Sequence, residues 1–422
     1  MNNLDNNTGK KAYIWNTSGS MVAAASSFLL LMFVTRRLGD EVGGVFSLAY
    51  TTAQIVLTVG KFGIRSYQAT DINYKISRDV YINSRIVLTL MMLALDGIYI
   101  LFAGYGADKA IIFLVVCAIK ACDAIEDVYH GELQRRGYLD KAGISLFIRN
   151  VITIIVFGIA VYTLGEIKNA LYITAAVSLL ITIAMNNFLI GKYADNISAM
   201  EHINQESGYL TLLYQCFPLF LGTFLSLYIY NVPKYVIEYG GNEKLITAYT
   251  VLFIPTFVIN LLSDFIFKPL LTGITKMWEE QNYSGIIRLI LRQCFYITTA
   301  LVLILLPTWF FGVKLLGVVY SIELDSYSLE LMILMFGGGA SALVYLAFNV
   351  LTCFRKQINI TVNYLTGAIF ITLLTPFLFE RYGIMGAAVS YAVTELILAE
   401  IMLVTIFYYL RSGIKGKKGI RI

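Results

Sequence analysis

The chain has 422 residues, of which 58% are hydrophobic and 14% are charged. Soluble domains carry about 25% charged residues, so this composition excludes a water-soluble enzyme, a secreted disulfide-stabilised domain and a disordered chain. The net charge of +5 is scattered between apolar segments, whereas nucleic-acid-binding proteins gather such charge on one polar face. The five cysteines lie in or beside hydrophobic segments, none at a metal-binding spacing such as CxxC, and no extracellular pair suggests a disulfide.

Twelve stretches of the chain are long and apolar enough to cross a membrane. A bilayer core about 30 Å thick requires roughly 20 apolar residues in a helix. The first stretch reaches Thr35, which is too long for the hydrophobic region of a cleaved signal peptide. We therefore predict an all-α, polytopic membrane protein with helices at residues 13–35, 44–64, 82–103, 110–131, 143–164, 170–191, 212–232, 248–267, 293–312, 329–353, 358–379 and 384–410.

Positive charges indicate how these helices are oriented. With the N-terminus in the cytoplasm, the cytoplasmic segments hold 22 lysine and arginine residues, Arg85 and Arg149 among them, and the outer turns hold 8. The positive-inside rule then predicts that both termini are cytoplasmic. Arg36 and Arg37 lie in the first outer turn, against this tendency, and so suggest an anionic partner at the outer mouth.

The longer loops divide the chain into two halves. We predict an N-terminal six-helix lobe at 1–191, a cytoplasmic inter-lobe loop at 192–211, a C-terminal six-helix lobe at 212–410 and a basic cytoplasmic tail at 411–422. Gly39-Asp40-Glu41 and Gly241-Asn242-Glu243 occupy the first outer turn of each half, as parallel repeats in transporters predict. All six prolines lie in the second half, where they favour bent helices, and the loop at 268–292 could include an interfacial helix.

Ionisable side chains form a stripe along the fourth predicted helix. At about 100° per residue its members fall within an arc of roughly 80°. Each ionisable group costs about 3 kcal/mol or more at the centre of a membrane helix, so the stripe cannot face lipid. It faces either a water-filled cavity or other helices, as an internal ladder of salt bridges. The stripe consists of Lys120, Asp123, Asp127, His130 and Gln134, with Glu126 at its edge.

In the cavity interpretation, Lys120 and Arg65 attract an anionic ligand, and Asp123, Glu126 and Asp127 offset their charge or bind a cation. In the second lobe the candidates are Asp264, Lys268 and Glu395, although a buried acid can also be neutral and hydrogen-bonded between helices. Neither a Walker loop nor an HExxH motif occurs, and the chain has two histidines. We therefore expect no metal and no nucleotide cofactor.

Four segments, taken in order along the chain, resemble Wzx-type oligosaccharide flippases. They lie in the first outer turn, at the end of the second helix, along the fourth helix and at the start of the last helix. With the length and the topology, the resemblance covers nearly the whole chain. The motifs are Arg37-Leu38-Gly39-Asp40-Glu41-x-Gly43-Gly44-x-Phe46, Phe62-Gly63-x-x-x-Tyr67-x-x-x-Asp71, Lys120-x-x-Asp123-x-x-Glu126-Asp127-Val128-Tyr129-His130-Gly131-x-x-Gln134 and Tyr382-Gly383-Ile384-x-Gly386-Ala387-Ala388.

The resemblance implies membership of the multidrug/oligosaccharidyl-lipid/polysaccharide exporter (MOP) superfamily. The implied fold has two six-helix lobes around a central cavity, as in MATE transporters, and works by alternating access. The implied substrate is a polyprenyl-pyrophosphate-linked oligosaccharide, such as an O-antigen unit of lipopolysaccharide, flipped to the outer leaflet of a bacterial plasma (inner) membrane. The implied partners are membrane lipids and the polymerase and chain-length proteins of polysaccharide assembly.

Transport of this kind needs no bond-making chemistry, so we expect neither an enzyme nor a cofactor. A proton gradient, a sodium gradient or the membrane potential could drive the cycle, since one charge crossing 100 mV is worth about 2.3 kcal/mol. The sequence leaves three alternatives open. They are a cation-coupled multidrug or small-molecule exporter of the same fold, a membrane-embedded sugar polymerase or ligase, and a non-transporting scaffold of polysaccharide assembly. Unlike the drug exporters, the first helix has no carboxylate between Asn16 and Thr35.

Overall fold

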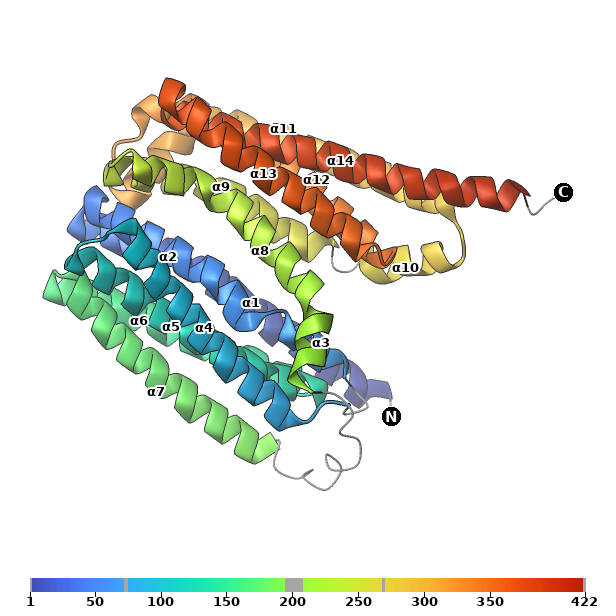
Figure 1. The fold of residues 1–422 in the computed structure, drawn as a ribbon, viewed down its shortest axis with the longest axis horizontal. Coiled ribbons are helices and arrows are strands. Elements are labelled where there is room, and N and C mark those ends of the chain that lie inside the picture. Colours follow the sequence, from blue (N-terminus) through green and yellow to red (C-terminus); the bar gives the residue numbers. More distant parts are fainter. Residues whose placement is uncertain (1, 72–74, 194–207, 268–269, 420–422) are drawn as a thin grey trace. The chain divides into compact units, whose positions relative to one another are not determined.

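The computed structural model describes residues 2–71, 75–193, 208–267 and 270–419, which form helices and short connections (Figure 1). The chain folds into two compact units, Met1–Phe224 and Leu225–Ile422. Their boundary lies inside one helix, α8 (Tyr209–Tyr239). The predicted loop at 192–211 falls largely outside the described residues.

The first unit is built from long apolar helices and one short helix. They are α1 (Asn2–Leu38), α2 (Asp40–Lys61), α3 (Ile64–Thr70), α4 (Arg78–Ala103), α5 (Ala107–Arg135), α6 (Leu139–Leu164) and α7 (Ile167–Tyr193), followed by the first part of α8. Within this unit, α5 packs against α2, α4 and α7, and α1 packs along α6. The stripe-bearing helix α5 therefore lies in the interior of the unit.

The second unit continues α8 and repeats this organisation. It contains α9 (Glu243–Phe267), α10 (Leu271–Glu279), α11 (Tyr283–Tyr320), the 3-10 helix η3 (Asp325–Tyr327), α12 (Ser328–Cys353), α13 (Gln357–Tyr382) and α14 (Ile384–Gly419). Here α12 is central, with α9 and α14 against it. Helix α14 extends through most of the predicted tail at 411–422, and α10 lies within the loop at 268–292.

The prediction of an all-α membrane protein with twelve spans is confirmed. Each predicted span overlaps one long helix, and eleven segments of the described chain are long and apolar enough to cross a membrane. The twelfth span is α5, whose 29 residues hold the charged stripe and so fall below the hydropathy of the others. A helix of this composition is tolerated in a bilayer because neighbouring helices surround its polar side chains.

The weak repeat between the two halves also appears in the backbone. Gly39 (φ 90°) precedes α2, and Gly241 (φ 72°) lies in the turn before α9. Both glycines have a positive φ, which residues with a Cβ rarely adopt. The first turn of each half therefore contains a glycine in a backbone conformation that other residues disfavour.

Three prolines lie inside helices of the second unit without ending them. Pro255, Pro307 and Pro376 lie inside α9, α11 and α13 respectively. Each removes one backbone hydrogen bond, and in a membrane neighbouring helices and hydroxyl side chains compensate for that loss. Three helices of the second unit thus lack one backbone hydrogen bond each, at the positions where the prolines favour a bend.

A close contact between α1 and α6 depends on Gly143. A Cβ at this position would lie 2.5 Å from the Asn16 nitrogen and 2.5 Å from the Trp15 carbonyl carbon. Gly143→Ala is therefore expected to lower the melting temperature of the purified protein in detergent, at a cost of about 1–3 kcal/mol for overpacking. Gly97→Ala in α4 is the control, because a Cβ there meets nothing within 4 Å. Equal melting temperatures for both variants would contradict the contact.

Candidate functional site

The charged stripe of α5 is buried inside the first unit. Lys120, Glu126, Asp127 and His130 are each less than a tenth exposed. The helical repeat predicts that they share one face, and the neighbouring helices supply basic partners for the acids on it. The site is therefore a set of acidic side chains on α5 paired with basic side chains of neighbouring helices.

Arg149 of α6 contacts the N-terminal part of the stripe. This guanidinium lies 2.5 Å from Asp123 Oδ1 and also donates to Glu126 Oε2. The Lys120 ammonium lies 3.0 Å from the other Asp123 oxygen, and the Ser145 hydroxyl donates to Glu126 over 2.9 Å. Two buried carboxylates are thus neutralised by two cations of the same unit, which is the arrangement that burial of charge requires.

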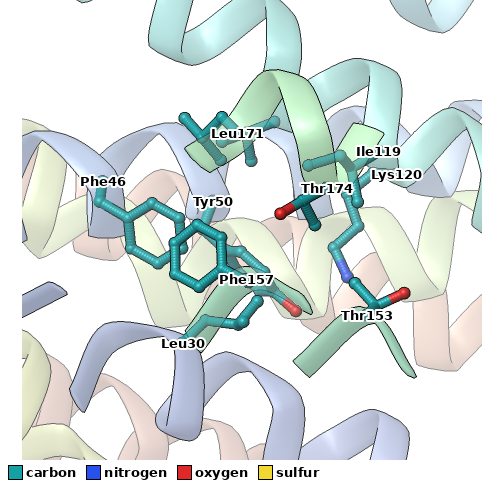
Figure 2. A pocket seen from close by; sticks show the side chains of 10 residues that line it. Leu30, Phe46, Tyr50, Ile119, Lys120, Thr153, Phe157, Leu171 and Thr174 are labelled. Carbon is teal, nitrogen blue, oxygen red and sulfur yellow. The ribbon is translucent and has the colours of Figure 1, made fainter. Parts of the chain in front are cut away.

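The Lys120 side chain also borders a small pocket between α1, α2, α5, α6 and α7 (Figure 2). Its ammonium lies 4.4 Å from the centre of the Tyr50 ring, a cation–π contact. In Figure 2 the side chain extends towards Thr153, whose hydroxyl lacks a hydrogen-bond partner among the described residues. The other lining residues are Leu30, Phe46, Val116, Ile119, Phe157, Leu171 and Thr174. This narrow apolar pocket has no room for a sugar chain.

The C-terminal part of the stripe contacts α4 and α3 through Asp127. The Arg85 guanidinium, 1% exposed, lies 2.9 Å from Asp127 Oδ2 and donates to the Gly60 carbonyl over 2.7 Å. Arg65 lies 3.6 Å from the other Asp127 oxygen and donates to Gln134 Oε1 over 3.3 Å. A quarter of the Arg65 side chain is exposed, so this cation can reach a ligand that Arg85 cannot.

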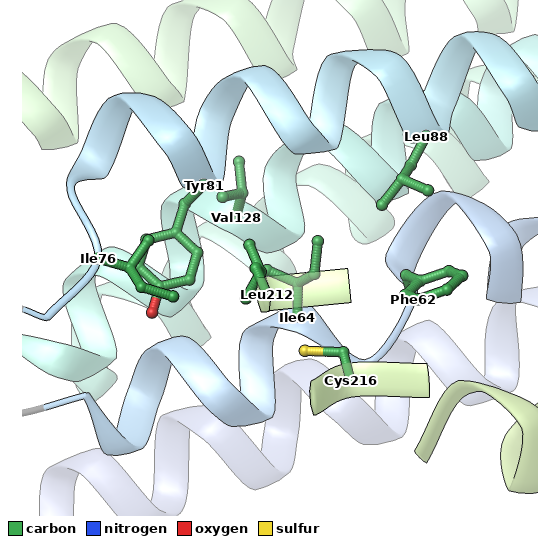
Figure 3. Close-up of a cluster of buried hydrophobic side chains, with 8 residues drawn as sticks. All are labelled: Phe62, Ile64, Ile76, Tyr81, Leu88, Val128, Leu212 and Cys216. Carbon is green, nitrogen blue, oxygen red and sulfur yellow. The ribbon is translucent and has the colours of Figure 1, made fainter. Parts of the chain in front are cut away.

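A break between α2 and α3 places Arg65 in this position. Phe62 and Gly63 both adopt the left-handed region, at φ 47° and 69°, so the chain turns and restarts as α3. The Phe62 ring is held by a stacked Phe220 ring, 4.4 Å away, and by the apolar cluster drawn in Figure 3. Lys61, the last residue of α2, is partly exposed and interacts electrostatically with Asp123 and Asp127.

A second polar cluster closes the end of α5. Glu132 pairs with Arg135 at 2.7 Å and with Arg136 at 2.5 Å. Asp71 accepts hydrogen bonds from the Tyr81 hydroxyl and from two backbone amides, and Arg135 lies 3.7 Å from it. These contacts join the end of α3 to α5. Asp71, the last residue of the Phe62–Asp71 motif, therefore has a structural role.

Basic groups outnumber acidic groups around the stripe. Five cations, at Lys61, Arg65, Arg85, Lys120 and Arg149, surround three carboxylates, at Asp123, Glu126 and Asp127. His130 Nε2 lies 3.2 Å from Glu126 Oε1, but among the described residues this nitrogen has no hydrogen bond of good geometry. The surplus of positive charge is carried on the partly exposed side by Lys61 and Arg65.

The assignment of Arg85 and Arg149 to cytoplasmic segments is wrong. Both side chains are buried within the unit and hold the acids of the stripe. The sequence carried a signal for this, since each arginine lies inside a predicted span, at 82–103 and at 143–164. A charged residue inside a span requires a buried partner, and the stripe offers the acids.

The other predicted site residues lie apart from this network. Arg36 and Arg37 are exposed in the last turn of α1, where the negative end of the helix dipole favours cations. Glu395 is buried in the second unit. Lys268 and the side chain of Asp264 lie outside the described residues. Among the residues that are described, no group of three or more His, Cys, Asp or Glu side chains is placed to hold a metal ion.

Comparison with solved structures identifies the class of fold. A mutant of the Vibrio cholerae MATE transporter VcmN has a TM-score of 0.67 at 17% identity, over 96% of this chain and 98% of that one. An inward-facing multidrug resistance MATE family transporter of the MOP superfamily has a TM-score of 0.72 at 13% identity, over 93% and 96%. The chain is a multi-pass membrane protein with a MATE-like fold.

Comparison with characterised sequences gives a more particular likeness. The capsular polysaccharide biosynthesis protein CapF of Staphylococcus aureus is 23% identical over 398 residues, or 92% of this chain and 96% of that protein. No family model matches the chain. The resemblance to polysaccharide flippases of the MOP superfamily, predicted from the motifs, is confirmed by the fold and by this relative together.

Proposed function

We propose that the protein flips a polyprenyl-pyrophosphate-linked oligosaccharide from the cytoplasmic to the outer leaflet of a bacterial plasma membrane. The transporter fold and the similarity to a capsular polysaccharide biosynthesis protein support transport in polysaccharide assembly. The sugars and the pyrophosphate cannot cross about 30 Å of hydrocarbon unaided, so a polar path through the protein is required. Polymerase and chain-length proteins would take up the product.

The surplus of cations in the first unit carries this proposal. Every carboxylate of the stripe already has an arginine or lysine partner, so no acid of the stripe is left unpaired for an organic cation. Lys61 and Arg65, which remain partly exposed, suit a pyrophosphate because ammonium and guanidinium groups form charge-assisted hydrogen bonds to phosphate oxygens. Lys120 is bound to Asp123 and Tyr50, which favours the salt-bridge ladder for that residue.

The predicted orientation fits this role. With both termini in the cytoplasm, Lys61 and Arg65 lie at the cytoplasmic end of the second span. The pyrophosphate of a newly made lipid-linked oligosaccharide lies at the same interface, while its polyprenyl tail stays in the bilayer. The first contact between protein and substrate would therefore be electrostatic and close to the α2–α3 break.

A multidrug exporter is the second candidate, because multidrug MATE transporters share the fold. Reconstitution separates the two. We expect liposomes containing the purified protein to move a fluorescent polyprenyl-pyrophosphate-linked oligosaccharide out of reach of a membrane-impermeant glycosidase, and to leave ethidium where it was loaded. Protein-free liposomes are the control for spontaneous movement. Transport of ethidium without movement of the lipid would favour the exporter and overturn the flippase proposal.

A further inference from the structure

One end of the second unit carries an excess of positive charge that the proposed transport site does not use. It comprises α10, the start of α11, the connection between α12 and α13, and the last turns of α14. Among the described side chains of residues 271–292, 353–359 and 408–413, the acids are Glu279 and Glu280. The cations of these segments, named here the basic end, are Lys276, Arg288, Arg292, Arg355, Lys356 and Arg411.

Contacts between helices gather these segments into one surface. The Trp278 ring of α10 stacks on Phe354 at the end of α12, with the ring centres 3.9 Å apart. The Lys356 ammonium lies 4.5 Å from the centre of the Tyr409 ring of α14. The Tyr409 hydroxyl in turn donates to Asn359 Oδ1 of α13 over 3.0 Å. The cations around α10, α13 and α14 therefore lie at the same end of the unit.

The end of α14 also packs against the start of α11. A Cβ at Gly413 would lie 2.6 Å from the hydroxyl oxygen of Tyr283, so the two helices are in close contact at this glycine. Arg411 comes two residues before Gly413, and Arg288 comes five residues after Tyr283. Beyond the contact, α14 continues to Gly419 (Figure 1), and its sequence there adds Lys415, Lys417 and Lys418.

An exposed aromatic band lies next to the basic end. Phe295 and Tyr296 of α11 and Tyr408 of α14 are each more than half exposed. They follow Arg292 by about one turn in α11 and precede Arg411 by about one turn in α14. In membrane proteins, exposed tyrosine rings lie at the level of the lipid headgroups, and arginine side chains reach the same level. The order of these residues therefore places the arginines at headgroup depth.

The length of the apolar surface of α11 supports this depth. Its exposed apolar side chains extend from Leu291 to Val318. At 1.5 Å per residue this stretch is about 40 Å long, close to the thickness of a bilayer with its headgroup regions. Arg288 and Arg292 lie at one margin of the stretch, and Lys314 lies near the other.

We propose that the basic end of the second unit binds the headgroups of anionic phospholipids in the leaflet that it faces. Guanidinium and ammonium groups form charge-assisted hydrogen bonds to phosphate oxygens, and two acids cannot neutralise six cations. Basic residues clustered at the end of a membrane helix are attracted to anionic lipids in this way. In the predicted orientation the leaflet is the cytoplasmic one. A bound lipid would hold α10 and the end of α14 against α11, whichever solute is carried.

Native mass spectrometry of the purified full-length protein in detergent, titrated with phosphatidylglycerol, tests this inference. We expect the wild type to bind phosphatidylglycerol more tightly than phosphatidylcholine. The double variant Arg288→Gln, Arg292→Gln should bind it more weakly, by about fivefold for each cation removed. Ending the chain after Gly413, which removes the lysines at the end of α14, should weaken binding as well.

The matched control is the double variant Lys314→Gln, Arg381→Gln. It removes two exposed cations from the opposite ends of α11 and α13, and it should leave the affinity for phosphatidylglycerol unchanged. Melting temperatures without added lipid show whether each variant is folded. If the double arginine variant does not fold, the chain ending at Gly413 provides the test.

Three results would overturn the inference. The first is equal affinity of the wild type for phosphatidylglycerol and phosphatidylcholine. The second is binding by the folded arginine variant that equals that of the wild type or of the control. The third is equally tight binding of glycerophosphoglycerol, the headgroup without acyl chains, which would make the surface a site for a soluble anion. None of these measurements follows transport, so the flippase proposal stands or falls separately.

Discussion

Replacing Arg85 with methionine is expected to destabilise the first unit strongly. The guanidinium is 1% exposed, lies 2.9 Å from Asp127 and donates to the Gly60 carbonyl at the end of α2. Its loss leaves Asp127 buried with the more distant Arg65, at 3.6 Å, and with the electrostatic interaction of Lys61. Breaking a buried ion pair by removing one partner costs about 3–5 kcal/mol.

The measurement is thermal unfolding of the purified variant in detergent, followed by size-exclusion chromatography. The double variant Arg85→Met, Asp127→Leu should recover much of the lost stability, because a buried pair replaced by apolar side chains is often neutral. Arg78→Met, at the first residue of the same helix, is the control for loss of a positive charge near the surface. A double variant as unstable as the single one would show that the ion pair is not the source of the effect.

The second large effect is expected on transport. Changing both Lys61 and Arg65 to glutamine should slow flipping of the lipid-linked oligosaccharide by about ten- to a hundredfold for each lost contact, because hydrogen bonds to charged groups are worth about 1.5–3 kcal/mol. The fold should persist, since Asp127 keeps Arg85 at 2.9 Å. Initial flipping rates in the liposome assay and melting temperatures in detergent measure the two properties separately.

Two variants make this prediction specific. Lys75→Gln removes an exposed positive charge near the same end of the first unit and should leave the flipping rate unchanged. Arg65→Lys keeps the charge but loses the planar fork of donors, so an intermediate rate is expected. Normal flipping by the double glutamine variant would remove the α2–α3 break from the substrate path. Loss of folded protein would instead assign both residues to stability.

The helical architecture was accessible from the sequence because membrane helices satisfy their own backbone hydrogen bonds and only need length and hydropathy. Each predicted span overlaps a long helix, and Gly39 and Gly241 close equivalent turns. The stripe on α5 was also predictable, since residues three and four apart share a face. These features depend on local pattern and are determined by the chain itself.

The partners of the stripe were decided by tertiary structure. A count of positive charges placed Arg85 and Arg149 in the cytoplasm, yet packing of α4 and α6 against α5 buries both beside carboxylates. The same packing pairs Lys120 with Asp123 in a salt bridge and leaves Arg65 partly exposed. Hydropathy and periodicity report how one helix meets its surroundings, but which charge neutralises which depends on how several helices pack together.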